Sequence, residues 1–250
     1  MSLIGQQPMG EWIAFWNSQH SIYVNARHRD VHYRTIAHDL EPYLPAAATV
    51  LDYGCGDALH ADLIATPGRE LTLCEAASSV RAALAQRFGS HPRIRVLSPE
   101  ELAALPAGSF DVIVMHSVAQ YLAPAEMETL LAEFQRLLKV EGFLILGDVV
   151  SPHVFAAADA MVLLRFAAAN GFLSAAIVGL ARTLLSEYWR LRSRLGLTRY
   201  SEAAMVGKLA AMGYCAQRAK ANIGHNPYRM TFLARRRETR TSEPDRVHLP

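Results

Sequence analysis

The sequence predicts an α/β fold: a Rossmann-like, seven-stranded, mainly parallel sheet with helices on both faces and a helical insertion between the fifth and sixth strands. Three observations predict it. Short apolar runs alternate with helical segments from about residue 49 to residue 150, a glycine-rich turn follows the first run, and an acidic residue ends the second. Alternation of this kind indicates βαβ units, whose parallel strands are covered by helices on both sides.

Composition limits the class of protein. The chain has 250 residues, 51% of them hydrophobic, and a formal net charge of +2. It is long enough for one α/β domain with an elaboration, and its charge is too small to indicate a nucleic-acid partner. Three cysteines give no disulfide framework and no zinc spacing, which favours a reducing cytoplasm. We see no secretory signal and no apolar run of the ~18 residues that a membrane span needs, and therefore expect a cytoplasmic protein.

The order of elements divides the chain into a cap, a sheet domain, an insertion and a tail. Expected strands cover residues 49–53, 71–75, 94–97, 110–115, 143–147, 216–223 and 229–234. Expected helices cover residues 25–40, 58–65, 79–88, 124–138, 154–169, 172–195 and 201–212. The corresponding parts are an N-terminal helical cap (1–45), the sheet domain (46–152 and 199–236), the insertion (153–198) and a disordered tail (237–250).

The glycine-rich turn is the motif that carries the functional argument. It reads Asp52-Tyr53-Gly54-Cys55-Gly56 and follows the first strand. Glycines let a ligand approach the backbone closely, and a following helix would supply free N–H groups. Glu75 ends the second strand at the same edge of the sheet, where ligands of open parallel sheets bind. Its carboxylate is well placed to accept hydrogen bonds from a ribose diol.

A nicotinamide dinucleotide is the rival ligand for such a turn. That fingerprint needs a third glycine for close packing of helix and strand, and Leu59 occupies the place. Asp52 and Asp57 flank the glycines and would repel a pyrophosphate. A ligand with a positive sulfonium and ammonium suits these acids better.

The motifs together resemble those of the class I S-adenosylmethionine (SAM)-dependent methyltransferases. Residues 52–56 look like the family's first motif, Glu75 like its ribose-binding acid, and residues 110–114 and 137–146 like its fourth-strand motif and the turn with its fifth strand. Ala58 stands where the family often has a third glycine, and Ser98 where many members carry an adenine-reading aspartate. The resemblance implies a SAM cofactor bound by Asp52, Tyr53, Gly54, Cys55, Gly56, Glu75, Ala76, Ser98, Pro99, Glu100, His116 and Ser117, with Tyr23 and His28 of the N-terminal cap covering it.

Polar side chains after the later strands predict the acceptor site. The expected acceptor-binding residues are Gln120, Tyr121, Asp148, His153 and Tyr228. An oxygen acceptor needs a base, and His is the usual choice because its unperturbed pKa lies near neutrality. We expect His225 in this role, with an ionisation near ~6.5, and His116 as the next candidate. Catalysis by proximity alone stays an alternative. No metal site is expected, because His and acidic residues do not pair at ligand spacing within one element.

The insertion leaves several alternatives open. Its apolar stretch is followed by Arg182, Arg190, Arg192 and Arg194. This pattern suits a lid, a homodimer surface or a contact with an anionic membrane. The expected function is methyl transfer from SAM to a small-molecule acceptor, with oxygen favoured. The alternatives are a lipid or glycolipid methyltransferase at the membrane surface and a non-catalytic SAM-binding partner protein.

Overall fold

The computed structural model describes residues 8–18, 22–183, 190 and 194–237. Within them, the chain forms a seven-stranded sheet in the order β3-β2-β1-β4-β5-β7-β6. The strands are β1 (Ala48–Tyr53), β2 (Arg69–Cys74), β3 (Ile94–Leu97), β4 (Phe110–His116), β5 (Leu138–Val149), β6 (Tyr214–Arg218) and β7 (Met230–Arg236). Strands β1 to β5 are parallel, so the predicted mainly parallel, seven-stranded sheet is confirmed.

The sixth strand departs from the expectation. It runs in the direction of β1 to β5, but within the described residues its sheet neighbour is β7, which is antiparallel to both β5 and β6. It also ends at Arg218, five residues before the expected end. Beyond the strand, the Ala219 N–H still donates to the Thr231 carbonyl (2.8 Å), whereas the Ile223 N–H donates to the Thr231 hydroxyl (3.0 Å). Residues 219–229 therefore form a long connection at the carboxyl edge of the sheet.

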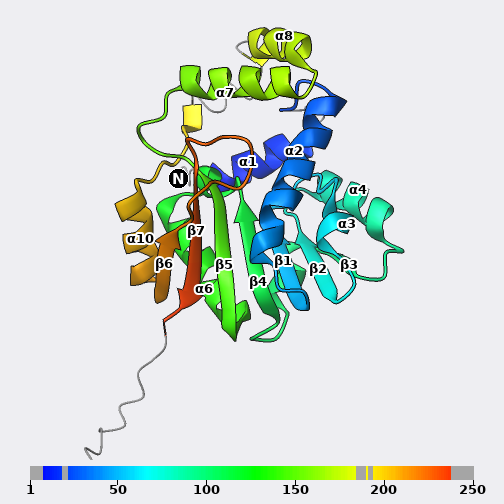
Figure 1. The fold of residues 1–250 in the computed structure, drawn as a ribbon. Helices are drawn as coiled ribbons and strands as arrows, with labels where there is room; N and C mark the ends of the chain where they lie inside the picture. The colour runs from blue at the N-terminus through cyan, green and yellow to red at the C-terminus, as the bar shows by residue number, and fades with distance from the viewer. Residues whose placement is uncertain (1–7, 19–21, 184–189, 191–193, 238–250) are drawn as a thin grey trace, which may run out of the picture.

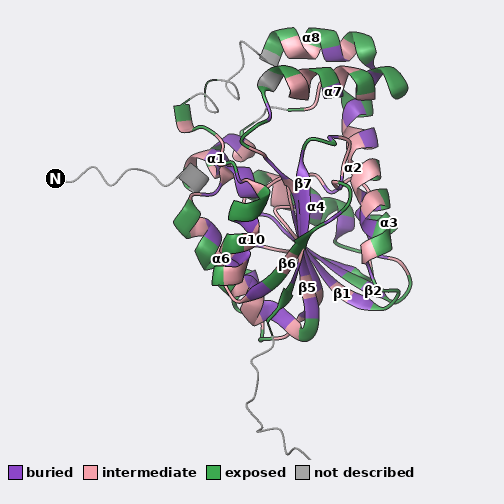
Figure 2. Ribbon diagram, turned by 60° about the vertical axis from the view of Figure 1, so that its left-hand side comes forward, coloured by how far each residue is buried: buried purple, intermediate pink, exposed green. Residues whose placement is uncertain are grey.

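Helices cover both faces of the sheet (Figure 1). One apolar core lies between the sheet and α2 (Ala26–Leu40), α3 (Ala61–Ile64) and α4 (Ser78–Phe88). The other lies between the sheet and α5 (Pro99–Ala103), α6 (Pro124–Leu137) and α10 (Glu202–Ala211). The interior strands are buried on both sides, as Figure 2 shows in purple, which explains their continuous apolar sequences.

Two boundaries were predicted wrongly for identifiable reasons. The helix expected at 58–65 begins only at Ala61, because Ala58 has a φ of 41°, which a right-handed helix does not accommodate. Residue 138, expected at the end of a helix, and the expected turn at residues 139–142 belong to β5, whose Leu138 pairs with Phe110 before the register shifts.

The remaining helices lie near the carboxyl edge of the sheet. They are α1 (Pro8–Asn17), α7 (Ala156–Ala169) and α8 (Leu173–Thr183), and Figure 1 shows α7 and α8 above that edge, beside the start of α2. Much of the second expected insertion helix, and the expected tail beyond residue 237, fall outside the described residues. None of the helices that the structure describes is long and apolar enough to cross a membrane.

Candidate functional site

The turn after β1 has no room for a Cβ atom at either of its two glycines. Gly54 and Gly56 have φ values of 71° and 56°, in the left-handed region that favours glycine. A Cβ on Gly54 would lie 2.5 Å from Val118 Cγ2, and a Cβ on Gly56 would lie 2.6 Å from the Tyr33 hydroxyl. Any other residue at these positions would displace its neighbours.

Two carboxyl groups flank this turn, those of the buried Glu75 and the half-buried Asp52. Burial, together with the charge of Glu75, raises the pKa of Asp52 to about 7. Burial also raises the pKa of Glu75, although its oxygens accept hydrogen bonds from the N–H groups of Ala77 (2.8 Å) and Gly56 (3.0 Å). Among the described residues, neither carboxyl group lies within ion-pair distance of a Lys or Arg side chain. A positively charged ligand such as SAM would satisfy both, so these residues fit the cofactor.

Helix α2 covers the turn. The Asp57 N–H donates to the Tyr33 hydroxyl (2.8 Å), and the Tyr23 ring lies 5.9 Å from the Tyr33 ring between centroids. Both phenols have pKa values raised by burial. The N-terminal cap therefore closes over the backbone that would hold the cofactor.

A cavity of about 210 Å³ lies beside the turn, between α2, the ends of β4 and β5, the β6–β7 connection and α7. Most of the residues that line it carry polar or ionisable side chains: His28, His32, His116, Asp148, Asp159, Leu163, Gly224, His225, Asn226 and Arg229.

Four of these residues are histidines in one cluster. The ring centroid of His32 lies 6.2 Å from that of His28, 6.5 Å from that of His116 and 5.8 Å from that of His225. Burial lowers the pKa of His28 to about 4, with a further contribution from His225. Burial likewise lowers the pKa values of His32 and His225. These three rings are therefore neutral at pH 7, and the expected ionisation of His225 near ~6.5 is displaced to lower pH.

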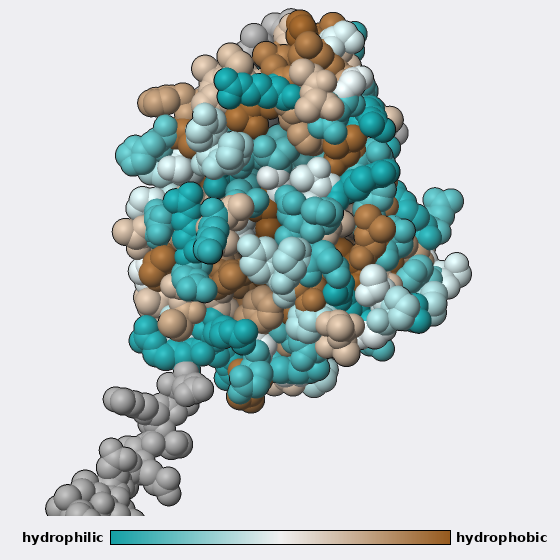
Figure 3. All heavy atoms as spheres, in the orientation of Figure 1, coloured by the Kyte–Doolittle hydropathy of each residue, from teal (hydrophilic) through white to brown (hydrophobic). Residues whose placement is uncertain are grey.

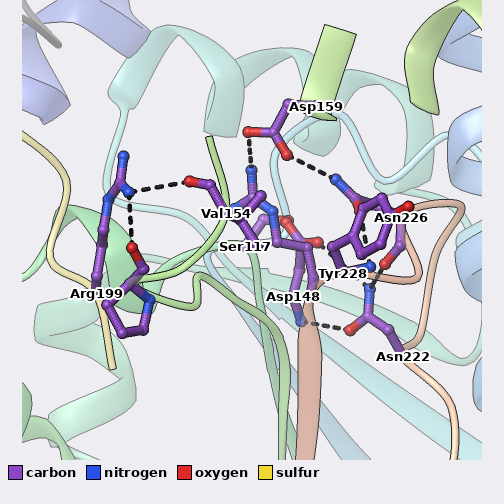
Figure 4. A network of polar contacts seen from close by, with 10 residues as sticks. Ser117, Asp148, Val154, Asp159, Arg199, Asn222, Asn226 and Tyr228 are labelled. Atoms are coloured by element: carbon purple, nitrogen blue, oxygen red, sulfur yellow. Dashed lines mark hydrogen bonds and ion pairs between the residues drawn. The ribbon is translucent and has the colours of Figure 1, made fainter. Parts of the chain in front are cut away.

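Two residues beside the cavity have strained backbones. Ser117 follows β4 and Asp148 lies at the end of β5, and their φ values are 58° and 59°. Their side chains meet, since the Ser117 hydroxyl donates to Asp148 Oδ2 over 2.7 Å. Figure 4 shows this contact and the Asn222 side chain on the other side of Asp148. Non-glycine residues in this region cost about 1–3 kcal/mol each and cluster at functional sites.

The insertion contributes one acid to the cavity. Asp159 of α7 accepts hydrogen bonds from Arg229 Nη2 (2.8 Å) and Asn226 Nδ2 (2.9 Å), both in the β6–β7 connection (Figure 4). The Asp159 and Arg229 side chains are only 21% and 10% exposed. This ion pair fixes α7 as the roof of the cavity.

The sequence of the sheet domain was compared with those of known protein families. Residues 51–146 match the family model described as a methyltransferase domain. This part of the chain is therefore similar to a methyltransferase domain, in agreement with the expected class I SAM-dependent methyltransferase. The cofactor of such a domain is SAM, which agrees with the two carboxyl groups and the glycine turn.

A curated relative and two solved structures extend the comparison. The chain is 33% identical over 118 residues to a ubiquinone biosynthesis O-methyltransferase of Xanthomonas axonopodis pv. citri (strain 306), over 46% of this chain and 48% of the relative. The matched segment thus spans about half the length of that relative. The fold is similar to that of the Burkholderia thailandensis 1,6-didemethyltoxoflavin-N1-methyltransferase, solved with its acceptor and S-adenosylhomocysteine (TM-score 0.59, 16% identity, 95% and 94% of the two chains). It is also similar to that of the Synechocystis PCC 6803 magnesium protoporphyrin IX methyltransferase, solved with SAM (TM-score 0.57, 16% identity, 95% and 100% of the chains).

The methyltransferase domain brings together some of the predicted site residues. His116, Asp148 and His225 line the cavity, and so does His28, which was expected at the cofactor. Ser98 caps α5, where its side chain accepts a hydrogen bond from the Glu101 N–H. Its role as a cofactor contact stays a prediction. The same holds for Tyr53, Cys55, Ala76, Pro99 and Glu100.

Four predicted acceptor residues do not line the cavity. Gln120 is buried elsewhere, and Tyr121 packs on Trp12 of α1 with ring centroids 4.5 Å apart. His153 and Tyr228 are exposed. Their assignment to the acceptor site remains untested.

Sequence reasoning missed His32 and Asp159. His28 and His32 are four residues apart on α2, a spacing that places both on one helix face, so the argument against ligand pairs within one element was incomplete. Among the described residues, no group of three or more His, Cys, Asp or Glu is arranged to hold a metal ion. Asp159 could have been noticed in the sequence, because it is the one acidic residue in the otherwise apolar stretch that forms most of α7.

Proposed function

We propose that this protein transfers the methyl group of SAM to an oxygen atom of a small polar acceptor bound in the cavity. The observation that carries this proposal is the position of His225, a neutral, half-buried histidine in the cavity beside the cofactor turn. SAM supplies an already activated methyl group. The tasks left to the protein are to align the acceptor, to exclude water and to remove the hydroxyl proton.

The surroundings of His225 suit a general base. Its ring stacks on Phe166 of α7, with centroids 4.3 Å apart and ring planes 18° apart, which fixes its orientation. Burial keeps the ring neutral and ready to accept a proton, while the negative charge of Asp148 acts in the opposite direction and would stabilise the imidazolium once it forms.

The cofactor side of the site has separate tasks. Asp52 and Glu75 would face the positive groups of SAM and its ribose hydroxyls, because both carboxyl groups lie beside the turn and, within the described residues, neither is within ion-pair distance of a Lys or Arg side chain. Tyr33, bonded to the Asp57 N–H, would help to keep water from the cofactor. Oxygen as the accepting atom is supported by the name of the curated relative, an O-methyltransferase.

Transfer of labelled methyl groups tests this function. The purified protein is incubated with methyl-labelled SAM and a bacterial small-molecule extract, and label in the non-SAM fraction is counted. We expect transfer above that of heat-inactivated protein, and a loss of about 100-fold or more in His225→Gln. The matched control is His38→Gln, which changes an exposed histidine of α2 outside the cavity. If the protein binds SAM but transfers no label, the non-catalytic alternative replaces this one. Normal transfer by His225→Gln would remove His225 from the chemistry.

A second candidate function is methylation of a lipid-linked acceptor at a membrane surface. Apolar side chains are exposed on and beside α7 and α8, the region at the top of Figure 3: Phe155, Met161, Leu173, Ile177 and Val178. Arg165 and Arg182 are exposed on the same helices, a combination that favours anionic bilayers. The polar head of such an acceptor would enter the cavity roofed by α7.

Sedimentation with lipid vesicles separates the two candidates. The membrane candidate predicts binding to vesicles that contain phosphatidylglycerol, weaker binding to neutral vesicles, and loss of binding in Ile177→Glu. The matched control is Leu63→Glu, an exposed leucine on α3. If the normal protein does not sediment with vesicles, the membrane candidate is rejected and the soluble acceptor remains. If the normal protein is a dimer that Ile177→Glu dissociates, this surface binds a second copy of the chain.

A further inference from the structure

A continuous chain of polar contacts links His116 to Asp148. His116 Nε2 lies 3.0 Å from the carbonyl oxygen of Ile223, and His116 Nδ1 lies 3.1 Å from Ser117 Oγ. Ser117 Oγ in turn lies 2.7 Å from Asp148 Oδ2. A carbonyl oxygen can only accept a hydrogen bond, so Nε2 must carry a hydrogen.

The hydroxyl hydrogen of Ser117 is assigned by the partners of Asp148. The Thr231 hydroxyl and the Asp148 N–H both donate to Asn222 Oδ1, over 2.9 and 3.2 Å. The amide orientation of Asn222 is thereby set, and its Nδ2 donor faces Asp148 Oδ1 (3.4 Å). Both carboxylate oxygens of Asp148 are thus approached as acceptors, and the one hydrogen of the Ser117 hydroxyl points to Oδ2.

This assignment leaves Ser117 Oγ as an acceptor toward His116. We propose that His116 carries hydrogen on both ring nitrogens, so that an imidazolium, a serine hydroxyl and the Asp148 carboxylate form one hydrogen-bonded chain beside the acceptor cavity. With a neutral ring, two lone pairs would face each other between Nδ1 and Oγ, and the contact would be repulsive.

The backbone conformation holds the side chains of this hydrogen-bonded chain together. Ser117 and Asp148 both occupy the left-handed region, and their strained conformations bring the two side chains together across adjacent strands. The His116 ring lies against Gly147, where a Cβ would approach Cδ2 to 2.5 Å. Among the described residues, the other titratable or charged groups around the cavity are His28, His32 and Asp39 of α2, Asp159 of α7, and His225 and Arg229 of the β6–β7 connection.

The fixed charge has a consequence for His225. Both nitrogens of His116 are engaged within the protein, so His116 acts as a positioning residue instead of taking the acceptor's proton directly. Its positive charge adds to burial in lowering the pKa values of His225 and His32. The charge of His116 thus offsets part of the opposite effect of Asp148, and burial remains the main cause that keeps the proposed base unprotonated. That role rests on the proposed function, whereas the double protonation of His116 does not.

Nitrogen NMR tests the protonation without an acceptor or SAM. The full chain is labelled with ¹⁵N-histidine, and the His116 ring signals are assigned with His116→Gln. At pH 7.5 we expect the pattern of a doubly protonated ring for His116 and of neutral rings for His32 and His225. Ser117→Gly and Asp148→Asn interrupt the chain, and both new residues tolerate a positive φ. In each variant His116 should become neutral. Ser109→Ala, which changes a half-buried serine just before the opposite end of β4, should leave the pattern unchanged.

The NMR patterns decide whether His116 is doubly protonated by the hydrogen-bonded chain or is an ordinary neutral histidine. A neutral His116 in the normal protein, or an imidazolium that persists in both variants, would overturn the proposal. If the variants do not fold, the measurement on the normal protein still decides. In Ser117→Gly the acid limb of the labelled-methyl transfer should also move to higher pH, because His225 loses a neighbouring positive charge. Absence of any transfer with an intact His116 pattern would reject the proposed function and leave the chain standing.

Discussion

The imidazole of His225 lies face to face with the ring of Phe166, with centroids 4.3 Å apart. His225 belongs to the connection between β6 and β7, and Phe166 belongs to the insertion helix α7. The insertion therefore buries the ring that we assign as the base, and this burial lowers the pKa of His225.

The pH dependence of turnover should follow from this burial. A protonated His225 cannot accept the acceptor's proton, so the rate should fall on the acid side, with a midpoint below the ordinary histidine value of ~6.5. Phe166→Ala exposes the ring and should move the midpoint up toward that value, whereas Phe155→Ala changes an exposed ring near the same helix and should not. The measurement is kcat against pH, and a midpoint above 7 in the normal protein would contradict the assignment.

Asp52 should make SAM binding depend on pH. Burial and Glu75 raise the pKa of Asp52 to about 7, so its carboxyl group is mostly neutral at pH 6 and mostly ionised at pH 8. The cationic cofactor should bind several-fold more weakly at pH 6, up to about tenfold per unit of pH. In Asp52→Asn this dependence should be lost. Calorimetry at the two pH values checks it, and equal affinities in the normal protein would place Asp52 away from the cofactor's charge.

The Asp159–Arg229 pair should stabilise the roof of the cavity. Asp159→Asn leaves the guanidinium of Arg229 buried without its counter-charge, which should cost about 2 kcal/mol of unfolding free energy in urea titrations. Glu128→Gln is the control, since Glu128 pairs with Lys208 at the surface and is 52% exposed. That change should cost less than about 1 kcal/mol. Equal losses in the two variants would show that the pair does not anchor α7.

Glu75 should contribute to cofactor affinity more than to stability. If its carboxylate holds the ribose hydroxyls, Glu75→Gln should weaken S-adenosylhomocysteine binding by about 1.5–3 kcal/mol. Glu70→Gln, on the exposed side of the same strand, should have no effect. An unchanged affinity in a folded Glu75→Gln protein would mean that other residues hold the ribose.

The sequence predicted the sheet domain well because its signals are local. Interior strands such as Phe110–His116 are buried on both faces and read as continuous apolar runs, and the left-handed turn after β1 requires glycine at Gly54 and Gly56. Boundaries failed where tertiary contacts replaced local ones. Residues 219–223, expected in the sixth strand, lie beyond it, and the Ile223 N–H bonds to the Thr231 side chain, a contact that no local pattern reveals.

The cavity was only partly predictable for the same reason. His116, Asp148 and His225 follow strands, and the carboxyl ends of these strands meet at one edge, so topology alone brings them together. His32 and Asp159 come from the cap and the insertion, whose placement over the sheet depends on packing between distant elements. The contact of Phe166 with His225 belongs to this second kind, and so does the lowered pKa that follows from it.

The most direct test of the account is calorimetric titration of the purified chain with S-adenosylhomocysteine and with NAD. The glycine turn and the two carboxyl groups that flank it predict a Kd in the micromolar range for S-adenosylhomocysteine, about −8 kcal/mol of binding free energy, and no heat of binding with NAD. Binding of NAD without a response to S-adenosylhomocysteine would contradict the central claim that this domain is built for SAM.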